Sequence, residues 1–172
     1  DTDYAQSAAV VSVQDEEITY AQNIYQRMYP ASTTKILTAY LALKFGNLDD
    51  VLTVSSDAVN TLMSGSSICG LKPGDQLTLD QALYGLMLCS GNDAANVIAE
   101  YISGSTDKFA ELMNKEAQAL GATQSHFVNP HGLPDDNHYT TAYDLYLIFN
   151  AAIKDDRFVN YISTKKYTNS YP

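Results

Sequence analysis

The segment that most constrains the fold is "STTKILTAYLALKFG", residues 32–46, because its apolar residues recur at helical spacing with little polar surface between them. Gly46 is placed to end the helix that this pattern predicts. A helix that is apolar on most sides must be surrounded by other elements, so we expect it to be mostly buried. The residues of the pattern are Ile36, Leu37, Tyr40, Leu41 and Leu43.

Further segments carry helix signals. "TLDQALYGLMLCSG" opens with a capping box, in which Thr78 and Gln81 satisfy N–H groups of the first turn, and it is expected to end at Gly91. "NDAANVIAEYIS" restarts at once, so two helices should meet at residues 90–92. "STDKFAELMNKEAQALG" predicts a helix with Ser105 as its N-cap, and "TTAYDLYLIFNAAIK" predicts another.

Strand signals are scarce by comparison. "AAVVSV" and "ITYAQN" flank a polar turn and predict a hairpin at about residues 8–23. The prolines and glycine of "ATQSHFVNPHGLPDDNHY" favour an irregular loop, and after Asp155 we expect only a short helix and the polar stretch "STKKYTNSYP". Because a two-stranded hairpin is marginal alone, the sheet needs strands that this sequence does not visibly supply.

Composition excludes some partners. A chain of 172 residues that is 45% hydrophobic can form one domain with a real core. The formal charge of −10, with no basic cluster beyond Lys165 and Lys166, disfavours nucleic acid as a partner. The apolar stretches are far shorter than the roughly 20 residues of a membrane span. "DTDYAQSAAVV" lacks the pattern of a signal peptide, which leaves the compartment open.

The two cysteines, Cys69 and Cys89, are too few for a disulfide framework and lack the spacing of a zinc or redox pair. Two buried thiols are the simplest interpretation. The alternative is a single bridge between them, which would indicate an oxidising compartment.

Three histidines and two aspartates in the loop that ends at Tyr139 could be considered as metal ligands: His126, His131, His138, Asp135 and Asp136. The histidines are five and seven residues apart in a segment that contains proline, and this matches no standard ligand spacing. We therefore expect a structural loop, with no metal and no cofactor.

Ser32 and Lys35 form a candidate nucleophile and base. Residues three apart on a helix share a face, so Lys35 can reach the Ser32 hydroxyl, which needs a base to become a good nucleophile. Burial would lower the lysine pKa toward the neutral range. The spacing alone is weak, because Ser-x-x-Lys recurs at residues 105–108 and 163–166. The alternative is that Ser32 caps the helix while Lys35 extends to solvent.

Ser90-Gly91-Asn92 is the only Ser-x-Asn string, and it lies where two predicted helices meet. A catalytic interpretation makes Ser90 a proton relay near Lys35 and lets Asn92 hydrogen-bond both Lys35 and a substrate amide. The alternative is a helix cap followed by a glycine stop.

The strings "YPASTTKILTA", "LMLCSGNDAANVIAEYI" and "FVNPHGLPDDNHYTTAYDL" together resemble the low-molecular-mass penicillin-binding serine D-alanyl-D-alanine carboxypeptidases. The resemblance implies a β-lactamase-like α+β fold, in which an antiparallel sheet packs against helices beside an all-helical lobe. It assigns residues 1–31 to strands, 32–46 to the nucleophile helix, about 47–140 to the helical lobe and about 141–172 to a return toward the sheet.

The resemblance also implies an activity. Ser32 would attack the D-alanyl-D-alanine end of a peptidoglycan stem peptide, release D-alanine and form an acyl-enzyme that water hydrolyses, and β-lactams would acylate the same serine. Lys35 would be the general base, Ser90 the relay and Asn92 the residue that orients Lys35 and the substrate. The family further suggests an extracytoplasmic location: secreted, in the cell wall or at the outer face of the membrane.

One motif of the family, Lys-Thr-Gly on a later strand, is absent from the 172 residues. The nearest string, Lys72-Pro73-Gly74, is expected to be a surface turn. We therefore expect the front part of a catalytic domain. A catalytically silent cell-wall-binding or sensor homologue is an alternative. A class A β-lactamase is disfavoured, because the sequence has neither Ser-Asp-Asn nor Glu-x-x-Leu-Asn.

Overall fold

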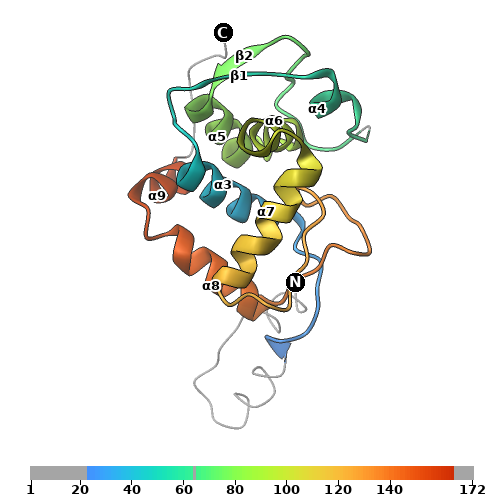
Figure 1. Ribbon diagram of the computed structural model, residues 1–172, viewed down its shortest axis with the longest axis vertical. Coiled ribbons are helices and arrows are strands. Elements are labelled where there is room, and N and C mark those ends of the chain that lie inside the picture. Colours follow the sequence, from blue (N-terminus) through green and yellow to red (C-terminus); the bar gives the residue numbers. More distant parts are fainter. Residues whose placement is uncertain (1–22, 64, 165–172) are drawn as a thin grey trace.

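The computed structural model describes residues 23–63 and 65–164. Their helices surround one central helix, α3 (Figure 1). The hairpin predicted at about 8–23 lies, except for its last residue, outside the described residues, and the division of the chain into strand and helix regions stays a prediction. The elements in chain order are η1 (Ala31–Thr33), α3 (Thr34–Phe45), β1 (Val51–Thr53), α4 (Ser56–Asn60), β2 (Gln76–Thr78), α5 (Leu79–Leu88), α6 (Asn92–Ser103), α7 (Thr106–Ala119), α8 (Ala142–Ala152) and α9 (Asp156–Ser163).

The central position of α3 follows from its apolar surface. The predicted helix over 32–46 is confirmed, although its first residues form the 3-10 turn η1 and Gly46 is the C-cap. Five helices pack against it, namely α5, α6, α7, α8 and α9. Because α3 is enclosed on several sides, the residues at its N-terminal end have a fixed place in the molecule.

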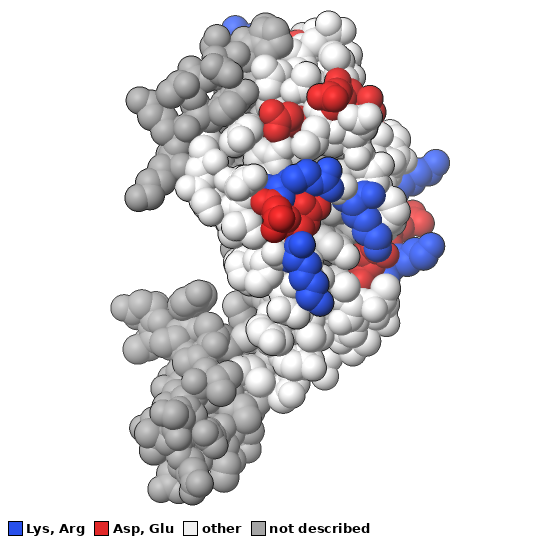
Figure 2. All heavy atoms as spheres, turned by 90° about the vertical axis from the view of Figure 1, so that its left-hand side faces the viewer, with Lys and Arg blue, Asp and Glu red and all other residues white. Residues whose placement is uncertain are grey.

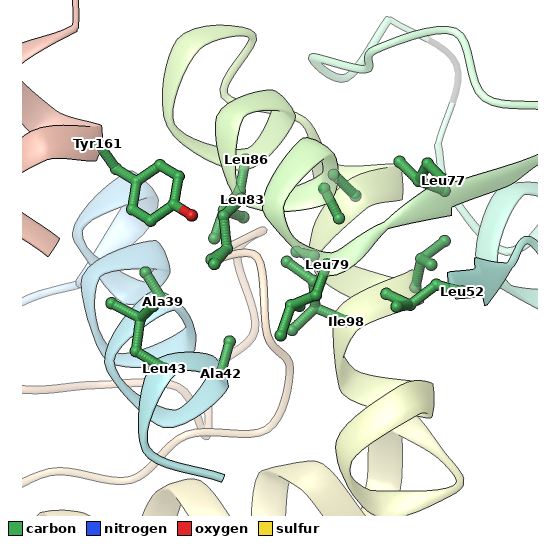
Figure 3. Close-up of a cluster of buried hydrophobic side chains, with 14 of the residues drawn as sticks. Ala39, Ala42, Leu43, Leu52, Leu77, Leu79, Leu83, Leu86, Ile98 and Tyr161 are labelled. Atoms are coloured by element: carbon green, nitrogen blue, oxygen red, sulfur yellow. The ribbon is translucent and has the colours of Figure 1, made fainter. Parts of the chain in front are cut away.

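Two apolar clusters hold α3 from different sides. In the first, Ala39, Ala42 and Leu43 face α5 and α6, whose Leu79, Leu83, Leu86 and Ile98 are fully buried (Figure 3). In the second, Leu37 and Leu41 pack with buried side chains of α7 and of the loop after it, including Phe109, Met113 and Phe127. Each fully buried leucine stabilises the fold by about 1.5–3 kcal/mol relative to an exposed one, so these contacts hold α3 in the core.

The junction between α5 and α6 was predicted at residues 90–92, and the structure confirms it. Both hydrogen bonds of the capping box are present: the Thr78 N–H donates to Gln81 Oε1 at 2.9 Å, and the Gln81 N–H donates to Thr78 Oγ1 at 3.1 Å. However, α5 ends at Leu88, earlier than the expected Gly91. Ser90 adopts a φ of +49°, and this left-handed conformation cannot continue a right-handed helix.

The sequence patterns missed a short sheet. Strand β1 pairs antiparallel with β2, so that Leu52 lies opposite Leu77, and both side chains are buried. Three-residue strands are too short to show a period-2 pattern, which is why no strand was predicted there. The exposed Lys72-Pro73-Gly74 string forms the turn that leads into β2, as expected.

The C-terminal helices agree with the patterns. Ser105 caps α7 by accepting a hydrogen bond from the Lys108 N–H at 3.1 Å. The segment between α7 and α8 is irregular as predicted, apart from isolated bridges that pair Met28 with Thr140 and His126 with Tyr139. Within the described ranges, no helix has the length and apolar character needed to cross a membrane.

The prediction of two buried thiols is wrong. Cys89 is exposed at the end of α5, and Cys69 is half-buried with its Sγ 3.2 Å from the Gly85 carbonyl oxygen. The alternative bridge is also wrong, since no disulfide joins these two described residues.

On the face that Figure 2 shows, Lys and Arg side chains lie among Asp and Glu side chains, and the described atoms there form no continuous basic patch.

Candidate active site

Ser32 lies in the 3-10 turn η1, immediately before α3, and is exposed. The preceding Ala31 has a φ of +48°, a conformation that is costly for a residue with a Cβ atom. Pro30 and Thr33 occupy the N-cap positions of η1 and α3, and neither helix has a side-chain cap. The interpretation of Ser32 as an N-cap is therefore wrong, and its hydroxyl is left available at the surface.

Lys35 lies in the first turn of α3 and is only 4% exposed. Burial lowers the pKa of its ammonium group below the ordinary value of 10.5, and the neighbouring Cys69 offsets part of this effect. The alternative in which Lys35 extends to solvent is therefore wrong. Lys44, at the other end of the same helix, shows the contrast, because it is exposed and pairs with Glu116 at 2.5 Å.

Asn92 begins α6 and is 3% exposed. Its backbone N–H donates to the Ser67 carbonyl at 2.9 Å. Its side-chain Oδ1 is the one fully buried side-chain nitrogen or oxygen atom in the described part of the chain that has no hydrogen-bond partner. A buried acceptor without a donor is costly, so this oxygen is available for a donor that a ligand or a moving side chain brings.

Cys69 connects the two candidate motifs. Its Sγ lies so close to Gly91 that a Cβ atom built there would be 2.4 Å away. The same residue is near enough to Lys35 to influence the lysine pKa. Asp93 fixes this segment, since it accepts hydrogen bonds from the Cys69 N–H at 2.9 Å and from the Leu71 N–H at 3.0 Å. The structure therefore brings Lys35 and the Ser-x-Asn string to the same region, while the roles of Ser32, Lys35, Ser90 and Asn92 stay predictions.

The loop that contains "NPHGL" packs directly on the Ser32 turn. A Cβ atom on Gly132 would lie 1.8 Å from the Ala31 carbonyl oxygen, so only glycine fits against this backbone. Asn129 Oδ1 accepts from the Gly132 N–H at 2.7 Å, and Thr38 Oγ1 donates to the Pro130 carbonyl at 2.6 Å. Sequence patterns identified this segment as a loop but gave no sign that it supports Ser32.

The three loop histidines each make hydrogen bonds inside the loop. His126 Nδ1 lies 2.5 Å from the Asn137 carbonyl oxygen, His131 Nδ1 accepts from the Leu133 N–H at 3.2 Å, and His138 Nδ1 accepts from the Val128 N–H at 3.0 Å. Burial, followed by the charge of Lys35, lowers the pKa of His131 to about 4, so His131 is neutral at pH 7. Across residues 23–63 and 65–164, no three His, Cys, Asp or Glu residues form a metal-binding group.

A pocket of about 230 Å³ lies beside the segment that leads into Ser32. The Arg27 guanidinium carbon is 3.9 Å from the centre of the Tyr139 ring, and the Tyr29 hydroxyl donates to Asp136 at 3.4 Å. The pocket therefore combines aromatic and charged groups, and the segment just before Ser32 forms part of its lining. Its lining consists of Arg27, Met28, Tyr29, Asp136 and Tyr139.

Comparison with known proteins finds relatives along nearly the whole chain. The family described as D-alanyl-D-alanine carboxypeptidase matches residues 2–171. The D-alanyl-D-alanine carboxypeptidase DacF of Bacillus subtilis is 37% identical over 171 residues, which cover 97% of this chain and 42% of that protein. DacB2 of Mycobacterium tuberculosis, with the same description, is 43% identical over 131 residues, or 75% of this chain and 44% of that protein. The chain thus spans less than half the length of these relatives.

Solved structures share the fold. Penicillin binding protein 6B from Escherichia coli superposes with a TM-score of 0.79 at 34% identity, covering 87% of this chain and 50% of that one. A single-residue variant of the Streptomyces K15 DD-transpeptidase gives a TM-score of 0.80 at 33% identity, covering 85% and 60%. The predicted α+β class is confirmed, and the described residues form a helix-rich part of that fold with a small antiparallel sheet.

Proposed function

The chain belongs to the D-alanyl-D-alanine carboxypeptidase family, and from this premise we propose that the complete protein removes the terminal D-alanine of peptidoglycan stem peptides with Ser32 as its nucleophile. The observation that carries the proposal is the pairing of an exposed serine with a buried lysine one turn further on. Ser32 is open to a substrate, while burial lowers the pKa of Lys35. A neutral amine at that place is a base for the serine proton.

The reaction would proceed in two halves. Lys35 takes the proton of the Ser32 hydroxyl as Oγ attacks the carbonyl carbon of the penultimate D-alanine. The C–N bond then breaks, the leaving amine receives a proton, and D-alanine departs. The rest of the peptide stays bound to Ser32 as an ester. A water molecule next attacks the ester carbonyl and gives a proton to Lys35. The bond between the carbonyl carbon and Ser32 Oγ then breaks, Lys35 returns the proton to Oγ, and the shortened peptide leaves.

The turn at Ser32 offers electrostatic support for the first half. Among the described residues, no backbone carbonyl accepts a hydrogen bond from the Ser32 N–H. An N–H at the start of a helix is suited to hold the oxyanion that develops during the attack, and the helix dipole favours negative charge there. We assign this role to the Ser32 N–H.

Ser90 and Asn92 complete the proposed machinery. Ser90 would relay the proton from Lys35 to the leaving amine, because its turn packs against Cys69, which is near enough to Lys35 to influence the lysine pKa. Asn92 would orient Lys35 and hydrogen-bond a substrate amide. The buried, unpartnered Oδ1 of Asn92 supports this role, because it is an acceptor that a substrate N–H can satisfy.

The same assignment leads to proposals about ligands and location. β-Lactams would acylate Ser32, since they offer a carbonyl to the same nucleophile. With peptidoglycan as its substrate, the protein would act outside the cytoplasm, either secreted, in the cell wall or at the outer face of the membrane. The Arg27–Tyr139 pocket, whose lining includes the segment just before Ser32, would contact the part of the stem peptide before the cleaved bond.

Two assays on the complete protein test the proposal. One follows the release of D-alanine from a peptide ending in D-alanyl-D-alanine, and the other follows labelling by a fluorescent penicillin. Ser32→Ala should lower both by about 10⁴-fold or more, which is the usual loss when a catalytic serine is removed. Ser105→Ala is the matched control, because Ser105 also stands three residues before a lysine but caps α7.

The outcomes separate the alternatives. Equal labelling of wild type and Ser32→Ala would refute Ser32 as the nucleophile. Rapid turnover of penicillin, in place of a long-lived adduct, would point to a β-lactamase. A protein that neither labels nor releases D-alanine would be a silent wall-binding or sensor homologue.

A further inference from the structure

We infer that His138 is a positioning residue for the Ser32 turn, which it holds through a buried hydrogen bond to Thr34. The inference rests on the proposed function, because a position for Ser32 matters only if Ser32 reacts. His138 lies 104 residues after Thr34, in the loop that also presses Gly132 against Ala31. One loop thus contacts the Ala31 backbone before the candidate nucleophile and the Thr34 side chain after it.

The bond between His138 and Thr34 is well defined. His138 Nε2 lies 2.9 Å from Thr34 Oγ1, and the two residues are 1% and 0% exposed. The Val128 N–H donates to the other ring nitrogen, Nδ1, at 3.0 Å. Since Nδ1 accepts, the proton of the neutral ring is on Nε2, and His138 donates to the threonine hydroxyl. The ring also packs edge-on against Phe127, with ring centres 5.4 Å apart.

A neutral His138 agrees with this arrangement. Burial is the main cause that lowers its pKa, to about 4, while Asp135 acts in the opposite direction and His126 adds to the decrease. At pH 7 the ring therefore keeps one donor and one acceptor, and both are used by buried partners. Such a residue links the backbone of its own loop to α3 without introducing a charge near Lys35.

The position of Thr34 gives the bond its consequence. Thr34 stands between Ser32 and Lys35 in the sequence, so a shift of its backbone moves both candidate catalytic side chains. The turn has no capping side chain, and Ala31 is held at a φ of +48°. A strained turn persists only when surrounding groups fix it, and the loop of His138 supplies these groups.

The test compares variants of the complete protein during acylation by a fluorescent penicillin. The reaction is separated into the dissociation constant of the first complex and the rate constant of the acylation step. His138→Leu removes both hydrogen bonds and should lower the acylation rate constant about 10- to 100-fold, as expected for a small misplacement of a nucleophile. The dissociation constant should change by less than about threefold, since His138 is only 1% exposed and therefore out of reach of a bound penicillin.

A rescue and a control distinguish positioning from a general effect on the loop. Gln can donate with its amide NH₂ and accept with its amide oxygen, so His138→Gln should keep the acylation rate constant within about threefold of wild type. His126→Leu changes a histidine of the same loop that makes no bond to α3, and it should leave acylation unchanged. If His138→Leu does not fold, Thr34→Val breaks the same bond from the other side, and Thr34→Ser keeps the hydroxyl.

Three results would overturn the inference. They are a folded His138→Leu with the wild-type acylation rate constant, an equal loss in His138→Leu and His126→Leu, and a loss confined to the dissociation constant. Ser32→Ala separates this failure from that of the proposed function. If Ser32→Ala is not labelled while His138→Leu reacts normally, only the positioning role is wrong. If Ser32→Ala reacts like wild type, both are wrong.

Discussion

Gly132→Ala is the substitution that most directly tests how the Ser32 turn is supported. Gly132 has a φ of +93°, and an added Cβ atom would lie 1.8 Å from the Ala31 carbonyl oxygen and 2.5 Å from the carbonyl carbon. Both contacts are with backbone, so no side chain can turn away to relieve them. Either the loop must retreat from Ala31 or the strained turn before Ser32 must move.

Two costs add in this variant. A left-handed conformation costs a residue with a Cβ atom about 1–2 kcal/mol, and overpacking a filled site costs a further 1–3 kcal/mol. We therefore expect a loss of about 2–5 kcal/mol in the free energy of unfolding. Gly104→Ala is a matched control, because Gly104 has a similar φ of +87° but nothing within 4 Å of an added Cβ atom. It should lose only the first amount, about 1–2 kcal/mol.

Urea unfolding of both variants in the complete protein, with penicillin acylation measured below the transition, checks the prediction. Gly132→Ala should be less stable than Gly104→Ala by about 1–3 kcal/mol, and only Gly132→Ala should acylate slowly. Equal stability losses combined with wild-type acylation in both variants would refute the contact between the loop and the turn.

Three other substitutions test the rest of the site. Lys35→Met should abolish acylation and leave the free energy of unfolding at pH 7 unchanged or higher, because burial lowers the pKa of Lys35. At pH values between the lowered pKa of Lys35 and 10.5, the lysine binds a proton more fully in the unfolded chain than in the folded one. The free energy of unfolding of the wild type, relative to that of Lys35→Met, should therefore rise with pH in that range. Asn92→Ala should slow acylation at least tenfold but cost under about 1 kcal/mol by thermal unfolding, because its Oδ1 has no partner in the described part of the protein. Asp93→Asn should lower the free energy of unfolding by about 1–3 kcal/mol in urea, since one amide oxygen cannot replace a carboxylate that accepts from Cys69, Leu71 and Ala94.

Local signals predicted much of the helical framework. The capping box of Thr78 and Gln81, the cap at Ser105 and the glycine after Phe45 all act within a few residues, so the sequence nearby is enough to find them. The burial of Lys35 was harder to predict. It depends on the helices that enclose α3. The local string could not reveal it, because Ser-x-x-Lys also occurs at two other places in the sequence.

Contacts between distant segments could not be predicted from the sequence. Gly132 meets Ala31 about a hundred positions away, and no local pattern encodes which loop a strained turn rests on. The pair of β1 and β2 was missed because each strand has only three residues. Cys89 was expected to be buried, but α5 ends at Leu88, which leaves the cysteine in an exposed turn.

The most direct measurement is peptide mapping by mass spectrometry after reaction of the complete protein with a penicillin. The three Ser-x-x-Lys strings begin at Ser32, Ser105 and Ser163, and trypsin separates them into different peptides. The penicillin mass should be found on the peptide of residues 28–35 alone, and Ser32→Ala should carry none. An adduct on Ser105, Ser163 or Ser90, or an unchanged amount of adduct in Ser32→Ala, would contradict the assignment of the nucleophile.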